Sequence, residues 1–122
     1  MANQVNWFEI PTQDLNRAKK FYEDVFELEL SLQEMGPMKM AWFPSEEKGA
    51  GATGTLVHHA GYQPSPQGVI IYFNVGSIED TLKKVESKGG KTVSGKQPIG
   101  PYGFTANFTD SEGNRVGLHE PA

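Results

Sequence analysis

The feature that most constrains this chain is a repeated order of predicted elements. Two stretches combine a capping residue with apolar side chains at helical spacing, the first running from Asp14 to Phe26 and the second from Ser77 to Lys88. One strand-like segment precedes each helix and three follow it. These segments are residues 5–10, 28–33, 38–43, 53–59, 68–75, 91–97, 103–109 and 114–120. The order β-α-β-β-β therefore occurs twice, in halves of about 60 residues each.

The length and the linker predict one domain made of two modules. A chain of 122 residues is long enough for a single core. The proline- and glycine-rich stretch "GYQPSP", residues 61–66, separates modules of about residues 1–60 and 67–122. We therefore predict an α+β fold in which residues 1–122 form one domain of two βαβββ units.

Composition excludes several classes of function. The net charge of −4 gives no basic surface for nucleic acid or for an anionic membrane. The absence of cysteine rules out disulfides, thiolate metal sites and a cysteine nucleophile. No apolar run approaches the roughly 18 residues of a membrane span, and the N-terminus lacks the pattern of a signal peptide. We expect a cytoplasmic protein that binds neither nucleic acid nor membrane.

Three of the predicted strands have one apolar and one mixed face. Side chains alternate along a strand, so each of these segments can be divided into two sets. The apolar sets are Phe8 and Ile10; Val69, Ile71, Phe73 and Val75; and Val116 and Leu118. The mixed sets are Val5, Trp7 and Glu9; Ile70, Tyr72 and Asn74; and Arg115, Gly117 and His119. The apolar faces suit packing beneath a helix, and the mixed faces predict the wall of a cavity. A sheet that faces solvent or a second subunit is the alternative.

Three stretches resemble the vicinal oxygen chelate superfamily, which includes glyoxalase I, bleomycin-resistance proteins and extradiol dioxygenases. They are "FEIPTQDLNRAKKFYEDVF", "VIIYFNVGSIEDTLKKVESKGGK" and "FTDSEGNRVGLHE". The resemblance spans nearly the whole chain. It implies a pair of βαβββ units whose mixed sheets curl as two half-barrels around a cleft, and it implies a homodimer.

The resemblance also implies where a metal would be held. Enzymes of the superfamily use His, Gln or Glu on the first strand of each half and a Glu on the last strand. Those positions fall here on Trp7, Ile70 and Gly117, and a further position on the fourth strand lies within residues 55–57. Indole, an aliphatic chain and a hydrogen atom cannot coordinate a cation. We therefore expect no cofactor and no metal at the usual site, with a divalent metal only at a non-standard one.

Two residues near these positions are candidates for chemistry. Glu9 and His119 each lie two residues beyond a metal position, on the same face, and a carboxyl and an imidazole can act as acid and base. They could equally form a structural pair, or lie apart. A displaced metal site would need one of His58 and His59 as well, and adjacent strand residues face opposite ways.

The remaining candidates are predicted to bind a ligand. Arg115 could hold an anionic group, and aromatic side chains could stack on a planar molecule. The predicted ligand-binding residues are Trp7, Trp42, Ile70, Tyr72, Asn74, Tyr102, Arg115 and Gly117. The stretch "DSEGN", residues 110–114, predicts only a turn.

These observations favour a protein that binds a small apolar or aromatic molecule in its cleft without a metal. The alternative is a glyoxalase-like lyase or isomerase that uses Glu9 and His119. A third hypothesis is a dimer that binds no small ligand.

Overall fold

The computed structural model describes residues 3–46 and 49–122, and it confirms the repeated element order. The first module contains β1 (Trp7–Pro11), α1 (Leu15–Phe26), β2 (Ser31–Met35), β3 (Met38–Trp42) and β4 (Thr53–His58). The second contains β5 (Tyr72–Asn74), α2 (Ile78–Ser87), β6 (Lys91–Pro98), the short 3-10 helix η1 (Gly100–Tyr102), β7 (Phe104–Thr109) and β8 (Arg115–Glu120). Both helices begin as predicted, because the side chains of Asp14 and Ser77 accept hydrogen bonds from backbone N–H groups of the first turn.

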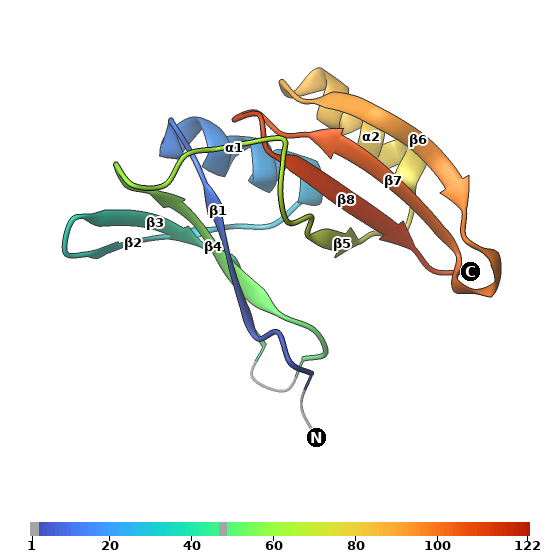
Figure 1. Ribbon diagram of the computed structural model, residues 1–122, viewed down its shortest axis with the longest axis horizontal. Coiled ribbons are helices and arrows are strands. Elements are labelled where there is room, and N and C mark those ends of the chain that lie inside the picture. The colour runs from blue at the N-terminus through green and yellow to red at the C-terminus, as the bar shows by residue number, and fades with distance from the viewer. Residues whose placement is uncertain (1–2, 47–48) are drawn as a thin grey trace.

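Each module forms one four-stranded mixed sheet. The strand order is β1-β4-β3-β2 in the first sheet and β5-β8-β7-β6 in the second, with β1–β4 and β5–β8 paired parallel. Figure 1 shows the two sheets diverging, with α1 and α2 beside each other on the same side of the molecule. The strands β1 and β5 are edge strands, and neither sheet closes on itself. The fold is therefore α+β with two open sheets, as predicted.

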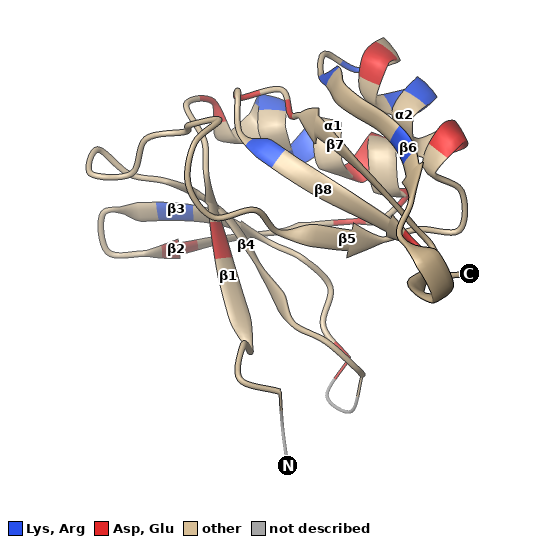
Figure 2. Cartoon of the chain, turned by 45° about the vertical axis from the view of Figure 1, so that its right-hand side comes forward, with Lys and Arg blue, Asp and Glu red and all other residues tan. Residues whose placement is uncertain are grey.

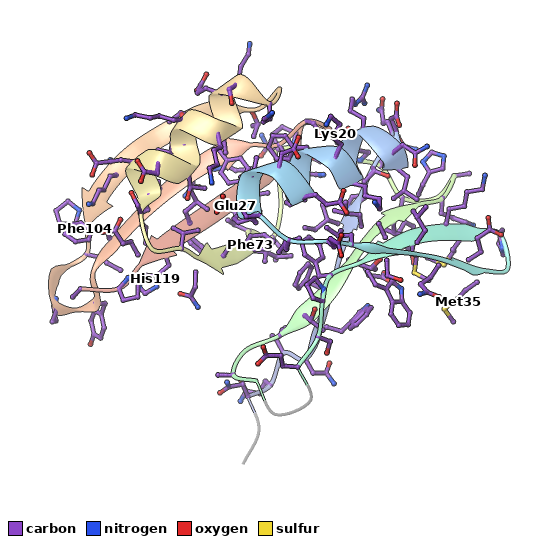
Figure 3. All side chains as sticks on the ribbon, turned by 180° about the vertical axis from the view of Figure 1, so that it is seen from behind. Lys20, Glu27, Met35, Phe73, Phe104 and His119 are labelled. Carbon is purple, nitrogen blue, oxygen red and sulfur yellow. The ribbon has the colours of Figure 1, made fainter. Side chains whose placement is uncertain are left out.

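The core lies between the helices and the apolar strand faces. Its cluster includes Ile10 of β1, Leu118 of β8 and the helical residues Phe21 and Val85, which are all almost fully buried. Phe73, labelled in Figure 3, stacks on Phe26 with ring centroids 4.6 Å apart. The helices therefore cover the apolar strand faces that strand parity predicted. Full burial of each such side chain contributes about 1.5–3 kcal/mol to the stability of the fold. The opposite face of each sheet is left open, and we call these the open faces.

Two strands begin more than two residues away from the predicted position, and the other strand ends differ by two residues or fewer. The fifth strand was expected over residues 68–75 but spans only Tyr72–Asn74. Tyr72 pairs with Gly117 in parallel, so residues 68 and 69 would need partners at 113 and 114, before β8 begins at Arg115. The carbonyl of Ile71 still accepts a hydrogen bond from the N–H of Gly117, at 2.8 Å. The second strand was expected over residues 28–33 but spans Ser31–Met35, because Glu27 has left-handed backbone angles and residues 27–30 form the exit from α1.

The turn at residues 110–114 links the two modules. The Glu112 side chain is fully buried and accepts hydrogen bonds from the backbone N–H groups of Gln13 and Asp14, each at 2.9 Å. It also receives two hydrogen bonds from the Arg17 guanidinium, at 2.7 and 2.9 Å. The carboxylate thus holds the N-terminus of α1, where the helix dipole favours negative charge.

Neighbouring residues of the same turn complete the link. The Tyr22 hydroxyl donates to Asp110 at 2.7 Å, and desolvation in this buried site raises the pKa of both groups. The Asn114 amide donates to the carbonyl of Pro11, and its oxygen accepts from the backbone N–H of Ser65 in the linker. The turn therefore fixes the end of β1, the start of α1 and the linker to the second module.

No helix within the described part of the chain is long and apolar enough to span a bilayer.

Candidate functional site

The open face of the first sheet carries a pair of indoles. Strand pairing places Trp7 and Trp42 on the same face, on either side of β4, and their ring centroids are 5.5 Å apart in an edge-on arrangement. Trp7 is 39% exposed, which is unusual for the largest apolar side chain. The Nε1 atom of Trp42 is buried and finds no hydrogen-bond partner among the described residues. An unsatisfied buried donor of this kind costs about 1–3 kcal/mol. We call these two residues the indole pair.

The open face of the second sheet explains the glycine in "RVGLHE". A Cβ atom added to Gly117 would lie within 2.8 Å of three ring carbons of Tyr72. The phenol ring, which comes from the neighbouring strand β5, thus occupies the space of the missing side chain. Gly117, which the sequence placed among the ligand-binding residues, therefore leaves no vacant volume on this face, and Tyr72 itself stays 51% exposed.

His119 is held by two neighbours on the second sheet. Its Nε2 atom lies 2.8 Å from the carbonyl oxygen of Tyr102, and its Nδ1 atom lies 3.0 Å from Oδ1 of Asn74. Both ring nitrogens are therefore engaged in fastening η1 and β5 to β8, and Tyr102 contributes its backbone here while its residue is 73% exposed. Figure 3 shows the imidazole at this edge of the second sheet.

No hydrogen bond joins Glu9 and His119 among the described residues. Glu9 lines a cavity at the junction of the modules, together with Arg115 and residues of the linker. Arg115 donates from Nε to the side chain of Asn107 at 2.8 Å. The acid–base pairing of Glu9 with His119 stays a prediction, and the structure gives each residue a different set of neighbours.

The residues at the predicted metal positions do not fit a metal. Trp7, Ile70 and Gly117 offer no donor atom, and the space beside Gly117 is filled by a ring. The register now fixes the fourth-strand position. Glu9 and Tyr72 each lie five residues before the N-cap of the following helix. Glu9 pairs with Thr55 and Tyr72 pairs with Gly117, so Thr55 is the counterpart of Gly117 in the first module. The Thr55 hydroxyl is fully buried and lies within hydrogen-bond distance of two backbone carbonyls.

The histidines considered for a displaced site are also bound to the backbone. The Nδ1 atom of His58 lies 3.0 Å from the carbonyl of Thr12, and that of His59 accepts from the N–H of Gly61. Strand parity places His58 on the α1 side of the sheet, opposite to Glu9. Among residues 3–46 and 49–122, no three His, Cys, Asp or Glu side chains gather closely enough to hold a metal ion.

Sequence reasoning missed two features of the site. It named Trp42 as an aromatic candidate but did not predict its contact with Trp7. It also did not predict that the ring of Tyr72 packs against Gly117. Strand parity alone could have grouped Trp42 with Thr55 and Trp7 once the β1–β4–β3 order was assumed. The seating of Tyr72 depends on cross-strand register, for which the sequence carries no local signal.

The sequence model of one protein family, the Glyoxalase/Bleomycin resistance protein/Dioxygenase superfamily, matches residues 4–118 of this chain. The chain therefore belongs to this superfamily. It is similar to a glyoxylase-like domain-containing protein of Didymella fabae, with 29% identity over 93% of this chain and 91% of that protein.

Solved structures share the fold. A glyoxalase I variant from Zea mays superposes with a TM-score of 0.73 at 18% identity, over 95% of this chain and 46% of that one. TnmS3, an antibiotic binding protein from Streptomyces sp. CB03234, gives a TM-score of 0.68 at 21% identity, over 98% and 97% of the two chains. A glyoxylase/bleomycin resistance protein/dioxygenase domain from Frankia sp. EAN1pec gives 0.71 at 16% identity over the full length of both chains. At these identities the likeness concerns the fold alone.

Proposed function

We propose that this protein binds a small planar aromatic molecule against the open face of its first sheet, without a metal at the superfamily's usual positions. The observation that carries the proposal is the indole pair, because it presents exposed aromatic surface beside a buried donor without a partner. Aromatic rings in edge-on or offset contact gain about 0.5–1.5 kcal/mol beyond area burial. A guest that inserts beside the indoles and offers a carbonyl oxygen to Nε1 of Trp42 would satisfy that donor. The likeness in fold to an antibiotic binding protein is consistent with such a role.

The test compares two bicyclic probes of the same shape, 1-indanone and indane, by isothermal titration calorimetry. We expect 1-indanone to bind more tightly, by roughly 2- to 10-fold, which is the worth of one neutral hydrogen bond. Trp42→Phe keeps an aromatic ring but removes the N–H group, so it is expected to abolish the preference for the ketone. Trp7→Phe is the matched variant and is expected to keep the preference. Absence of binding to both probes, or equal preference in wild type and Trp42→Phe, would contradict the proposal.

Several observations favour this function over the lyase or isomerase alternative. Both ring nitrogens of His119 lie within hydrogen-bond distance of neighbours, and Glu9 lines a cavity whose described lining includes Arg115 but not His119. General acid–base catalysis needs both groups within reach of one substrate. We therefore propose binding rather than catalysis.

We further propose that two copies of the chain associate through their open faces. Large apolar side chains remain exposed there, among them Trp7 at 39%, Met35 at 60% and Tyr72 at 51%. A second copy would cover this surface and enclose the ligand from the other side. Light scattering during size-exclusion chromatography is expected to give twice the chain mass of 13.4 kDa. The mass of a single chain at micromolar concentration would refute the dimer and leave the test with the two probes unaffected.

A further inference from the structure

A small cavity lies where the two modules meet, and we call it the junction pocket. One wall is the end of β1, the other is the start of β8, and the linker closes the third side. The hydrogen bond from the Asn114 amide to the carbonyl of Pro11, at 2.8 Å, joins the two strands at its base. The volume is about 150 Å³, far above what one water needs and below the roughly 300 Å³ of a drug-sized site. The pocket therefore suits a molecule smaller than a drug-sized ligand.

Two opposite charges line this pocket without neutralising each other. Glu9 belongs to one wall and Arg115 to the other, and among the described residues they are the only charged ones in the lining. In the described part of the chain neither forms an ion pair with any residue. Figure 2 shows an acidic segment on β1 and a basic one at the start of β8. The hydrogen bond from Arg115 Nε to Asn107, at 2.8 Å, orients the guanidinium and leaves its two terminal amino groups for another acceptor.

The remaining lining adds an aliphatic floor and a polar rim. Ile10 and Val116 come from the core side of their strands, Ile71 directly precedes β5, and Val69, between β4 and β5, is 91% exposed. Gln63 of the linker and Gln67 just after it supply side-chain amides. Within the described part of the chain no aromatic ring lines the pocket, which distinguishes it from the indole pair.

We propose that the junction pocket binds a small aliphatic zwitterion, with the carboxylate on Arg115, the ammonium on Glu9 and the alkyl group on the floor. A zwitterion matches a lining whose two charges cancel, whereas a simple anion or cation would leave one of them uncompensated. An α-amino acid with a branched aliphatic side chain has this chemistry and this size. The site does not depend on the proposed aromatic ligand, because it uses other residues and another class of molecule.

The test titrates three probes with the same alkyl group and different charges: L-leucine, 4-methylpentanoate and 3-methylbutylamine. We expect L-leucine to bind up to about fivefold more tightly than either analogue, since an exposed charge pair is worth at most about that factor. Glu9→Gln is expected to weaken L-leucine about fivefold and to leave 4-methylpentanoate unchanged. Arg115→Gln is expected to weaken L-leucine and to leave 3-methylbutylamine unchanged.

Two exposed charges outside the pocket give matched controls. Glu29→Gln and Lys83→Gln remove the same charges and are expected to leave all three affinities unchanged. Thermal midpoints of all four variants near that of the wild type would show that the fold is intact. No binding of L-leucine at millimolar concentration would overturn the proposal, as would binding that neither Glu9→Gln nor Arg115→Gln weakens. The assay with 1-indanone is read separately, so loss of one site does not imply loss of the other.

Discussion

Replacing Glu112 with alanine is expected to lower the free energy of unfolding by about 3 kcal/mol. The carboxylate accepts four hydrogen bonds from Gln13, Asp14 and Arg17, and its side chain is fully buried. Hydrogen bonds to a charged group contribute about 1.5–3 kcal/mol each when lost, and a helix cap about 1 kcal/mol, although water compensates the exposed partners in part. The loss also frees the start of α1 from the second module. Urea denaturation followed by tryptophan fluorescence measures the effect.

Two further variants separate the causes of this loss. Glu112→Gln keeps an acceptor of similar shape but removes the charge, so we expect roughly half of the loss. Glu29→Ala removes an exposed carboxylate and is expected to change stability by less than about 0.5 kcal/mol. Equal stability of Glu112→Ala and the wild type would mean that the turn does not hold the modules together.

The same variants are expected to alter the dependence of stability on pH. Burial acts to raise the pKa of Glu112, but hydrogen bonds from Arg17 and from backbone N–H groups outweigh it and hold the pKa below 4.5. As the pH falls, the unfolded chain binds a proton at Glu112 before the folded chain does. The stabilisation by the Glu112 carboxylate is therefore complete above pH 4.5 and is lost as the pH falls through the lowered pKa. Asp110 acts in the opposite direction, because burial raises its pKa above 3.8. Glu112→Gln should therefore lose less stability than the wild type on acidification from about pH 7 to about pH 3.

Much of the fold follows from local patterns in the sequence. Caps at Asp14 and Ser77 and the helical spacing behind them predict α1 and α2, because these signals act within a few residues. Strand parity placed Phe8 and Leu118 toward the helices for the same reason. Strand ends were less predictable. The short β5 depends on where β8 begins, and a partner so distant in sequence leaves no local signal.

The site shows the same division. Parity correctly grouped Trp7 with Glu9, and Gly117 with His119, on the open faces. It could not show that Glu9 and Arg115 line the same cavity, since that depends on how the modules meet. The role of Glu112 was missed because its partners Gln13 and Asp14 lie 99 and 98 residues away along the chain. A turn motif predicts local backbone geometry only, and its long-range contacts come from tertiary packing.

The second large effect is expected at Gly117, where alanine should lower the free energy of unfolding by about 2 kcal/mol. Its Cβ atom would lie within 2.8 Å of three ring carbons of Tyr72, so the ring must rotate away from the glycine and lose its contacts there. In a Tyr72→Ala background the three nearest atoms are absent. Alanine in a strand is then favoured over glycine by about 0.5–1 kcal/mol of backbone entropy. Gly117→Ala is therefore expected to lower the free energy of unfolding in the wild type and to raise it in the Tyr72→Ala background. A double-mutant cycle measured by urea denaturation would detect this reversal.

Gly54 provides the matched control for this cycle, because it faces Phe8 across β1 and β4 as Gly117 faces Tyr72. The nearest atom to a Cβ on Gly54 is the backbone carbonyl oxygen of Phe8, and two ring carbons follow at 2.7 Å. Truncating Phe8 removes the ring but not the carbonyl, so Gly54→Ala should stay destabilising in a Phe8→Ala background. Additive effects at Gly117 and Tyr72 would mean that the ring does not occupy the place of the missing side chain. The position at which the family resemblance implies a metal-binding carboxylate would then have free space beside it, and the steric argument against a metal at Gly117 would fail.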